Sequence, residues 1–255
     1  MDKQAFLEKF HLGEEDLIAA NITWEELTRI REDYRHLESV MRELGKSFID
    51  EYLYDIETAG IHSYRYRTKD ADHLLEKVIR KRKENPEKFA HLDHTNYYKY
   101  VTDLIGIRVF FLYREEWSRF HQYITGRFEN DPKQYIQDRL LDFDEDPNHY
   151  YIAERPKAFK RAGDSKIYDA EEIDIVTTGI YRSLHYNVKY RGHYVEVQCR
   201  TLFEEGWSEV DHHIVYKDAE DDEMLRDYSG LLNRLSGLAD EMSSYFLRLK
   251  HEREK

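Results

Sequence analysis

The chain has 255 residues and a formal net charge of −13, with 52 acidic residues against 39 lysines and arginines. A chain of this length can bury one substantial core, and it has no apolar run of the length that a membrane-spanning helix requires. The acidic balance disfavours a long polyanion such as a nucleic acid as the general partner. The first residues lack the features of a secretory signal, so we expect a cytoplasmic protein.

Residues 1–60 are predicted to form a helical segment. Thr23 and Glu26 have the spacing of a capping box, and apolar residues follow at intervals of three and four. This pattern predicts one long amphipathic helix that covers a face of a sheet. A second helix is predicted over 70–84, with Asp70 as its cap, its leucines, valine and isoleucine facing inward and its cations facing outward.

A continuous apolar run predicts a buried central strand over 107–112. Asp103 stands just before this strand. A carboxylate at the mouth of a strand and facing phosphates is a natural ligand for Mg²⁺, and the alternative is an acid that caps a turn. The stretch over 65–83 is rich in lysine and arginine, and a local basic patch in an acidic protein suits a small polyphosphate.

The most informative stretch runs over 179–201. Residues 184–190 and 194–199 are rich in β-branched and aromatic side chains in alternation, and Arg191-Gly192 between them predicts the tight turn of a β-hairpin. Alternation places every second side chain on the same face of a strand. The polar side chains that share a face in this way are Tyr181, Ser183 and His185 on the first strand, and Glu196, Gln198 and Arg200 on the second.

The periodicity weakens over 129–173. Within this region the basic segment 155–166, which contains Gly163, is predicted to be a loop. Such a loop either closes over the phosphates of a substrate or remains an ordinary solvated connection. Helices are predicted on both sides of the region, over 115–128 and over 202–217.

The last helix is predicted over 222–250. Its apolar residues recur every three and four positions along its whole length, which is the period of a coiled-coil seam. The seam consists of Tyr228, Leu231, Leu235, Leu238, Met242, Tyr245 and Leu249. A seam this regular requires a partner, which is either the first long helix of the same chain or a second subunit.

Several segments together resemble the synthetase domain of the RelA/SpoT family of alarmone synthetases. In chain order these segments are Arg67-Thr-Lys69, Asp103-Leu-Ile-Gly-Ile-Arg108, Tyr181-Arg-Ser-Leu-His185, Glu196-Val-Gln-Cys-Arg-Thr201 and Trp207-Ser-Glu-Val-Asp-His212. The resemblance implies an α/β fold: a mixed sheet of about five strands flanked by helices, similar to a nucleotidyltransferase, with long terminal helices. It also implies three parts, an N-terminal helical segment over 1–60, the synthetase domain over 61–217 and a C-terminal helix over 218–255.

The resemblance further implies an activity, the Mg²⁺-dependent transfer of pyrophosphate from ATP to the 3′-hydroxyl of GDP or GTP. The products would be the alarmones ppGpp and pppGpp of the stringent response. Asp103 would bind Mg²⁺, and Glu196 would complete the metal site or accept the proton of the hydroxyl. ATP would be held by Arg67, Lys69 and Lys77, and the acceptor nucleotide by Tyr181, His185, Gln198 and Arg200. The first 60 residues are too few for the hydrolase domain of the family, so we expect synthesis without degradation.

This chain departs from the family pattern at two places, and the one before Tyr181 leaves the acceptor open. Thr177 and Gly179 replace a lysine and an asparagine that precede the tyrosine in the family, and His73 stands where serine is usual in the ATP motif. One alternative is a toxic relative that modifies an adenine nucleotide or the 3′ end of tRNA, although the acidic balance weighs against tRNA. The other is an inactive nucleotide-binding regulator, which would not need both Asp103 and Glu196. The family also implies a homo-oligomer formed through the terminal helices.

Overall fold

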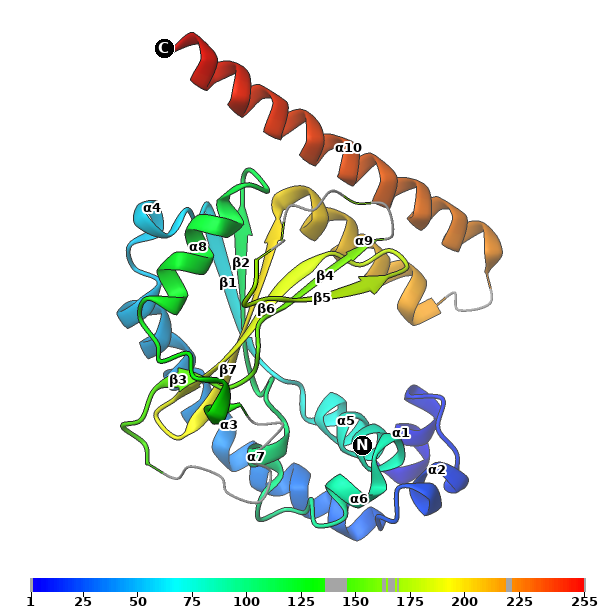
Figure 1. The fold of residues 1–255 in the computed structure, drawn as a ribbon. Coiled ribbons are helices and arrows are strands. Elements are labelled where there is room, and N and C mark those ends of the chain that lie inside the picture. The colour runs from blue at the N-terminus through cyan, green and yellow to red at the C-terminus, as the bar shows by residue number, and fades with distance from the viewer. Residues whose placement is uncertain are drawn as a thin grey trace.

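A computed structural model describes residues 2–135, 146–161, 164, 168, 170–218 and 222–254. The helices of this part of the chain surround one mixed β-sheet (Figure 1). The strands are β1 (Ser63–Thr68), β2 (Ile105–Phe111), β3 (Tyr151–Ile152), β4 (Lys157–Arg161), β5 (Asp174–Thr178), β6 (Ser183–Tyr190) and β7 (His193–Thr201). Their order across the sheet is β1-β2-β7-β6-β4-β5, and β3 pairs with β6. The predicted fold class is confirmed, with seven strands where about five were expected.

The helices are numbered in chain order together with one short 3-10 turn, η1. They are α1 (Lys3–Lys9), α2 (Glu14–Ala19), α3 (Trp24–Tyr52), α4 (Ile56–Ala59), α5 (Ala71–Glu84), α6 (Pro86–Phe89), α7 (Tyr97–Tyr100), α8 (Glu116–Thr125), η1 (Pro132–Gln134), α9 (Leu202–Asp218) and α10 (Glu223–Arg253). None of the helices in the described part of the chain combines the length and the apolar composition that a bilayer crossing needs.

The hairpin of β6 and β7 occupies the middle of the sheet, as predicted. Arg191 and Gly192 form its turn with φ angles of 48° and 78°. Positive φ at both central residues is the geometry of a type I′ turn, whose twist matches that of the flanking strands. On its other side β7 pairs in parallel with β2, and β2 pairs antiparallel with β1. The strand predicted over 107–112 is therefore β2, and it begins at Ile105.

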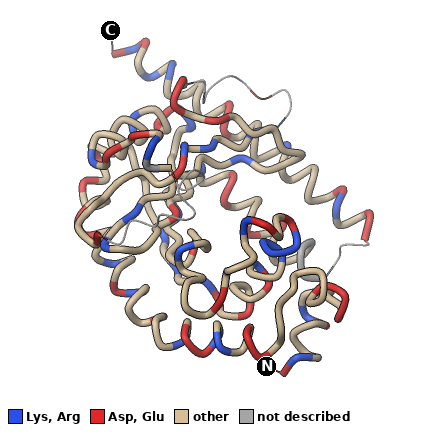
Figure 2. Tube along the Cα trace, turned by 60° about the horizontal axis from the view of Figure 1, so that its bottom comes forward, with Lys and Arg blue, Asp and Glu red and all other residues tan. Residues whose placement is uncertain are grey.

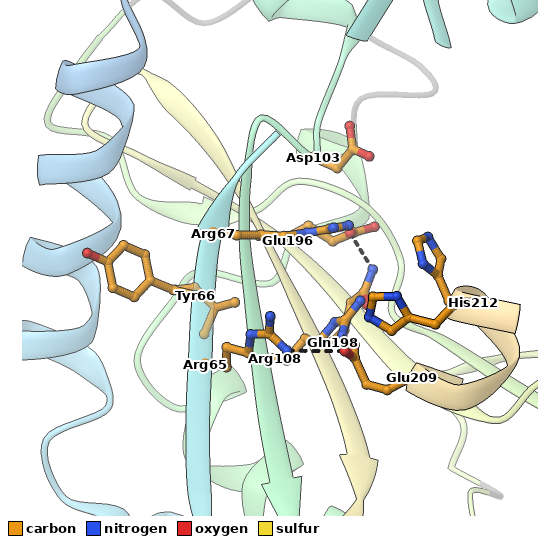
Figure 3. A pocket seen from close by; sticks show the side chains of 12 residues that line it. Arg65, Tyr66, Arg67, Asp103, Arg108, Glu196, Gln198, Glu209 and His212 are labelled. Carbon is orange, nitrogen blue, oxygen red and sulfur yellow. Dashed lines mark hydrogen bonds and ion pairs between the residues drawn. The ribbon is translucent and has the colours of Figure 1, made fainter. Parts of the chain in front are cut away.

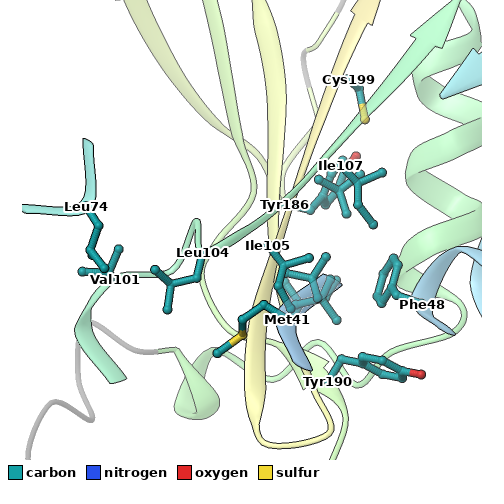
Figure 4. Close-up of a cluster of buried hydrophobic side chains, with 14 of the residues drawn as sticks. Met41, Phe48, Leu74, Val101, Leu104, Ile105, Ile107, Tyr186, Tyr190 and Cys199 are labelled. Atoms are coloured by element: carbon teal, nitrogen blue, oxygen red, sulfur yellow. The ribbon is translucent and has the colours of Figure 1, made fainter. Parts of the chain in front are cut away.

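One face of the sheet carries the hydrophobic core. Every second residue of β2, β6 and β7 contributes to this face, where Ile105, Ile107 and Tyr186 are fully buried. From α3, Met41 and Phe48 pack against them, and Phe48 also contacts the ring of Tyr190 at 5.4 Å between centroids. Figure 4 shows this cluster between the sheet and the helices. The opposite face of the same strands is left for polar side chains.

The long helix α3 begins as predicted, but its capping box is only half formed. The hydroxyl of Thr23 accepts a hydrogen bond from the backbone N–H of Glu26 at 3.2 Å. The carboxylate of Glu26 does not return to Thr23; it accepts from the backbone N–H of His94 at 2.7 Å. The helix ends at Tyr52, and a separate short helix, α4, follows. Glu26 thus joins the start of α3 to a segment far along the chain.

Helix α5 is capped by Asp70, whose side chain accepts from the next N–H groups, as predicted. Its apolar residues face inward, also as predicted. The prediction that all its cations face outward is wrong for Arg82, which is buried. Its guanidinium donates to the backbone oxygens of Ala20, Leu92 and Asn21 at 2.7, 3.0 and 2.6 Å. Arg82 therefore fastens α2 and the segment after α6 onto α5.

The loop predicted over 155–166 is wrong for its first half. Lys157–Arg161 forms β4, which pairs antiparallel with β6 and in parallel with β5. Five-residue strands give too short a pattern to be recognised from alternation alone. Gly163 and Lys166 lie outside the described residues.

Helix α10 buries the face opposite to the one expected. The predicted apolar seam is largely exposed: Tyr228, Leu235 and Leu238 are 62%, 53% and 57% exposed. The buried residues are small or polar instead, namely Ser229, Asn233, Ser236, Gly237, Asp240 and Ser244. α10 packs on α9, and Figure 1 shows it at the opposite end of the molecule from α3. The first of the two predicted partners, the chain's own first long helix, is therefore wrong.

Asp240, on the buried face of α10, should make the stability of the fold depend on pH. Burial, and then the neighbouring Glu204, raise its pKa to about 7, while the hydrogen bond from Thr201 lowers it. The folded state then retains a proton that the unfolded chain has lost, so Asp240 costs stability progressively as pH rises from about 4 to about 7. We expect Asp240→Asn to remove this loss. The unfolding free energy of the variant should therefore rise relative to that of the wild type as pH increases from 5 to 8. Urea unfolding across that range would measure this change. For the control Asp227→Asn, at an exposed position of α10, the difference in unfolding free energy from the wild type should be the same at every pH. The same pH-independent difference for Asp240→Asn would contradict the prediction.

Candidate active site

The face of the sheet opposite the core is lined with charged and polar side chains. The strand register places Arg67, Gly106, Glu196 and Asn187 in one row across β1, β2, β7 and β6. The next row contains Arg65, Arg108, Gln198 and His185. Residues two apart on a strand share a face, so both rows point to the same side. Two strands from early in the chain and the hairpin of β6 and β7 thus present one continuous polar surface.

Part of this surface forms a pocket of about 220 Å³. It lies between the strands, Asp103 and the exposed side of α9 (Figure 3). Its charged and polar lining is Arg65, Arg67, Asp103, Arg108, Glu196, Gln198, Glu209, His212 and His213. Tyr66 contributes only at the edge, because its ring turns away toward α3. Gly106 leaves the floor open, since a Cβ placed there would meet only Arg67, at 3.8 Å.

Asp103 stands at one end of the pocket between two lysines. Lys69 Nζ and Lys77 Nζ each lie 2.8 Å from Asp103 Oδ2. Burial by itself raises the pKa of Asp103, but the two ammonium groups outweigh it and lower the pKa to about 2. The carboxylate is therefore ionised at neutral pH. Lys69 precedes Asp70, the cap of α5, and Lys77 lies within α5. The two lysines therefore reach the same carboxylate without sharing a helix face.

The residues present fit a magnesium ion. Asp103 Oδ1 is buried and has no hydrogen-bond partner among the described residues, whereas Oδ2 is occupied by both lysines. Glu196 lies close enough for the charge of Asp103 to act on its pKa. Mg²⁺ is bound in proteins through one or two carboxylates, with phosphates and waters completing its shell. The orphaned oxygen and the nearby second carboxylate provide this donor set.

Glu196 belongs to a closed ring of five side chains. Its Oε2 accepts from Gln198 Nε2 at 2.6 Å, and its Oε1 lies 3.6 Å from His185 Nδ1. His185 Nε2 lies 3.0 Å from the hydroxyl of Tyr181. Arg200 closes the ring, because its Nη2 donates to that hydroxyl at 2.7 Å and to Gln198 Oε1 at 3.3 Å. The ring holds the four predicted acceptor-binding residues and the predicted base in one network.

The ring fixes the direction of one hydrogen bond. Arg200 can only donate, so the hydroxyl of Tyr181 accepts from Arg200, and it also lies 3.0 Å from His185 Nε2. The other ring nitrogen of His185, Nδ1, faces Glu196. Burial raises the pKa of Glu196, but His185 outweighs this and holds the pKa below its ordinary value. Glu196 is therefore an ionised acceptor with an oriented imidazole beside it.

Arg200 has a supporting position. It is buried, and its guanidinium lies over the ring of Tyr181, 4.9 Å from the centroid. Its Nη1 donates to Glu205 and Ser208 of α9 at 3.1 and 2.7 Å. These contacts place Arg200 beside Tyr181 and α9, and its role in holding the acceptor nucleotide stays a prediction.

The sequence pointed to α9 only through the motif that ends at His212, and the contacts of Glu205 and Glu209 with Arg108 were not predicted. Arg108 Nη1 lies 2.7 Å from Glu205 Oε1 and 2.5 Å from Glu209 Oε1, two acids one helical turn apart. These contacts hold Arg108 in the pocket wall, and Figure 3 shows Glu209 and His212 extending from α9 toward it. Acids at positions i and i+4, followed by histidine at i+7, lie on one face of a helix. That spacing was the available signal.

The departures from the family pattern are visible at the start of β6. Gly179 has open space around it, because a Cβ placed there would meet nothing within 4 Å. Thr178 occupies this turn with its hydroxyl, which accepts from the N–H of Tyr181 at 3.1 Å and donates to its carbonyl at 2.7 Å. His73 contacts the ring of Phe10 edge-on, at 5.1 Å between centroids. No described residue therefore lies against the position that a Cβ at residue 179 would take.

The fold and the site together define an α/β domain with a polar pocket at whose end a carboxylate is paired with two lysines. The sequence profile described as the region found in RelA / SpoT proteins matches residues 66–221. The chain belongs to this family. A search of the curated proteins returns no match.

Solved structures show the same fold. The small alarmone synthetase 1 from Bacillus subtilis, bound to its product pppGpp, aligns with a TM-score of 0.50 and 18% identity over 91% of this chain and 98% of its own. A GTP pyrophosphokinase family protein from Streptococcus pneumoniae aligns with a TM-score of 0.51 and 16% identity over 99% and 97%. The small alarmone synthetase 2 from Bacillus subtilis gives 0.51 and 16% over 86% and 99%. The division of the chain at residues 60 and 217 remains a prediction.

Proposed function

We propose that this chain transfers pyrophosphate from ATP to the 3′-hydroxyl of GDP or GTP, in the cytoplasm, and so makes ppGpp or pppGpp. The observation that carries the proposal is Asp103, which is ionised, paired with Lys69 and Lys77, and left with one buried oxygen unpartnered. Family membership and the shared fold support it. A carboxylate with these neighbours serves a site in which phosphate charge must be neutralised.

The donor would lie in the pocket along β1 and β2. Arg67 and Arg108 line it with guanidinium groups, which suit the faces of an adenine ring, and Lys69 and Lys77 are placed for the phosphates. Asp103 and Glu196 would hold Mg²⁺, which would neutralise phosphate charge when bound. Binding of the phosphates would give the two lysines further anionic partners next to Asp103.

The acceptor would lie against the ring of five side chains. Tyr181 would stack on the base, and His185 and Gln198 would orient the ribose near Glu196. The 3′-oxygen forms a bond to the β-phosphorus of ATP while the bond from that phosphorus to the α,β-bridging oxygen breaks, and AMP leaves. Glu196 takes the hydroxyl proton, with His185 Nδ1 at 3.6 Å from its Oε1 to stabilise its orientation.

A transfer assay tests the function directly. ATP labelled in its β-phosphate would be offered with Mg²⁺ to GDP, GTP, ADP and deacylated tRNA separately, and the products resolved by chromatography. Label on GDP or GTP, with AMP as coproduct, supports the proposal. Label on ADP or tRNA alone would replace GDP and GTP with another acceptor, and no transfer would leave only nucleotide binding.

Acidic and basic residues are interspersed along the chain (Figure 2), which favours a nucleotide over a long RNA.

We also propose that the exposed seam of α10 pairs with a second copy of this chain. Leu235 and Leu238 lie in the middle of a stripe that is more than half exposed over most of its length. Asp222, Glu223 and Asp227 outnumber Arg226 at one end of the helix, and Arg248, Lys250 and Arg253 outnumber Glu252 and Glu254 at the other. An antiparallel pair places each acidic end beside a basic one, and a two-fold axis produces that arrangement.

Leu235→Glu should convert the assembly to monomers, because it places a charge in the middle of the buried seam. Sedimentation velocity at micromolar concentrations would measure the mass of each species. Ile18→Glu, which replaces a 78% exposed apolar residue on α2, should leave the mass unchanged. A wild-type chain that is already monomeric at these concentrations would contradict the pairing.

A further inference from the structure

The backbone just before Tyr181 is held from two directions. Thr178 binds both the N–H and the carbonyl of Tyr181 from within the turn. From outside the turn, Asn233 Nδ2 of α10 donates to the carbonyl oxygen of Ile180 at 2.9 Å. Ile180 is the immediate neighbour of Tyr181, and 53 positions separate it from Asn233 in sequence. A residue of the C-terminal helix thus reaches the segment that presents the tyrosine.

Asn233 is itself fixed by a second hydrogen bond. Arg161 Nη1, at the end of β4, donates to Asn233 Oδ1 at 2.6 Å. Arg161 and Arg182 both contact Asp164, with Arg182 Nε at 2.8 Å from its Oδ2. Arg182 also pairs with Glu204, at the start of α9. The carboxamide therefore lies within a network that joins β4, β6, α9 and α10.

Both ends of the Asn233 side chain are needed for this arrangement. The side chain is 1% exposed, so an unmatched polar atom there would not be compensated by water. Its oxygen faces a cation that can only donate, and its nitrogen faces a carbonyl that can only accept. Asparagine supplies one donor and one acceptor at this reach, and aspartate or leucine would satisfy one partner or neither.

We propose that Asn233 is a positioning residue for acceptor binding: through Ile180 it sets the backbone from which Tyr181 extends into the ring with His185 and Arg200. This inference rests on the proposed function, in which Tyr181 stacks on the acceptor base. The donor half of the site, at Asp103 and α5, has no contact with Asn233. Its loss should therefore weaken acceptor binding and leave ATP binding unchanged.

Two variants separate the two bonds of Asn233. Asn233→Asp retains an oxygen for Arg161 and loses the donor to Ile180, whereas Asn233→Ala loses both. The matched control is Ser244→Ala, at a fully buried position on the same face of α10, whose hydroxyl donates to Glu115 at 2.7 Å and not to the acceptor turn. Each of the three substitutions removes a buried hydrogen bond from α10, so general loosening of the helix should affect them similarly.

The first readout is hydrogen exchange, which does not depend on catalysis. We expect deuterium uptake in a peptide over 178–183 to accelerate at least about threefold in both Asn233 variants and to remain at the wild-type rate in Ser244→Ala. The second readout is steady-state kinetics with the best acceptor. The acceptor KM should rise about five- to tenfold in both Asn233 variants, with the KM for ATP unchanged, as for the loss of one hydrogen bond.

Two results would overturn the inference. One is unchanged exchange over 178–183 in both Asn233 variants. The other is faster exchange in the Asn233 variants together with an acceptor KM no higher than that of Ser244→Ala, or together with a KM for ATP that rises as much as the acceptor KM. If the wild-type chain transfers no label to any acceptor, the proposed function fails, and exchange alone still decides whether Asn233 holds the turn.

Discussion

Asp103→Asn should reduce pyrophosphate transfer by at least about a thousandfold. The substitution keeps the shape of the side chain and removes its charge, so Lys69 and Lys77 lose the anion they share at 2.8 Å. It also replaces or weakens the unpartnered oxygen proposed to bind Mg²⁺. Two buried cations without a counter-ion should cost roughly 3 kcal/mol of unfolding free energy as well.

The loss of stability must be separated from the loss of chemistry. Asp72→Asn is the matched control, because Asp72 is as buried as Asp103 and pairs with Arg31 at 3.2 Å away from the pocket. It should lower the melting temperature while transfer continues near the wild-type rate. Binding of Mn²⁺ in the presence of an ATP analogue, followed by electron paramagnetic resonance, should weaken only in Asp103→Asn. Wild-type metal affinity in that variant would remove Asp103 from the metal site.

The Asp103 contribution to stability should depend on pH in a definite direction. Its pKa is lowered to about 2 in the folded state, so the stabilisation is fully present above about pH 4 and is lost as pH falls toward 2. The difference in unfolding free energy between the wild type and Asp103→Asn should therefore shrink over this acidic range. Denaturant unfolding at pH 6 and pH 3 would measure it.

Glu196→Gln should reduce kcat about a hundredfold to ten-thousandfold, while ATP affinity changes less than about threefold. Glutamine retains the volume of Glu196 but replaces one carboxylate oxygen with an amide nitrogen, next to the donor Gln198 Nε2 and to His185 Nδ1. It cannot take the proton of the acceptor hydroxyl. Rapid-quench measurement of the first turnover would isolate the chemical step from product release.

The two proposed roles of Glu196 predict different secondary effects. If Glu196 acts mainly as the base, the pH–rate profile should lose its acidic limb and the Mg²⁺ requirement should not change. If it acts mainly as a metal ligand, the Mg²⁺ concentration for half-maximal rate should rise. Glu51→Gln, at the exposed pair with Arg191 near the hairpin turn, should leave both measurements unchanged. Unchanged turnover in Glu196→Gln would exclude Glu196 from the mechanism.

The hairpin and its polar face could be predicted because they depend on local rules. Alternation assigns His185 to one side of β6 and Gln198 to one side of β7, and a two-residue turn sets the register that pairs them. Asp103 was likewise recognised from its position before an apolar strand. Strand periodicity thus grouped Glu196 with Gln198, and the resemblance to a family added Arg67, whereas Arg65 and Glu209 of the pocket lining were not predicted.

Other features depend on residues that meet only in the folded chain. Arg82 has the helical position of a solvated cation, but three backbone oxygens from other segments draw it into the interior. Arg200 reaches the hydroxyl of Tyr181, 19 positions before it, as well as two residues of α9. No local pattern could show that Ala20, Asn21 and Tyr181 would be partners of these arginines, since they lie at distant positions in the sequence.

The last helix shows most clearly the difference between local and tertiary determinants of structure. Its sequence determined that residues 222–250 would be helical and would carry an apolar stripe, because period and propensity act within the helix itself. Only the tertiary structure decided which face docks on the body of the protein. Asn233, Ser236 and Asp240 find hydrogen-bond partners on β4, β7, α9 and the turn before β6, so the polar face is buried and the apolar stripe is left exposed. Burial follows the partners that the fold brings within reach, and a single helix carries no information about them.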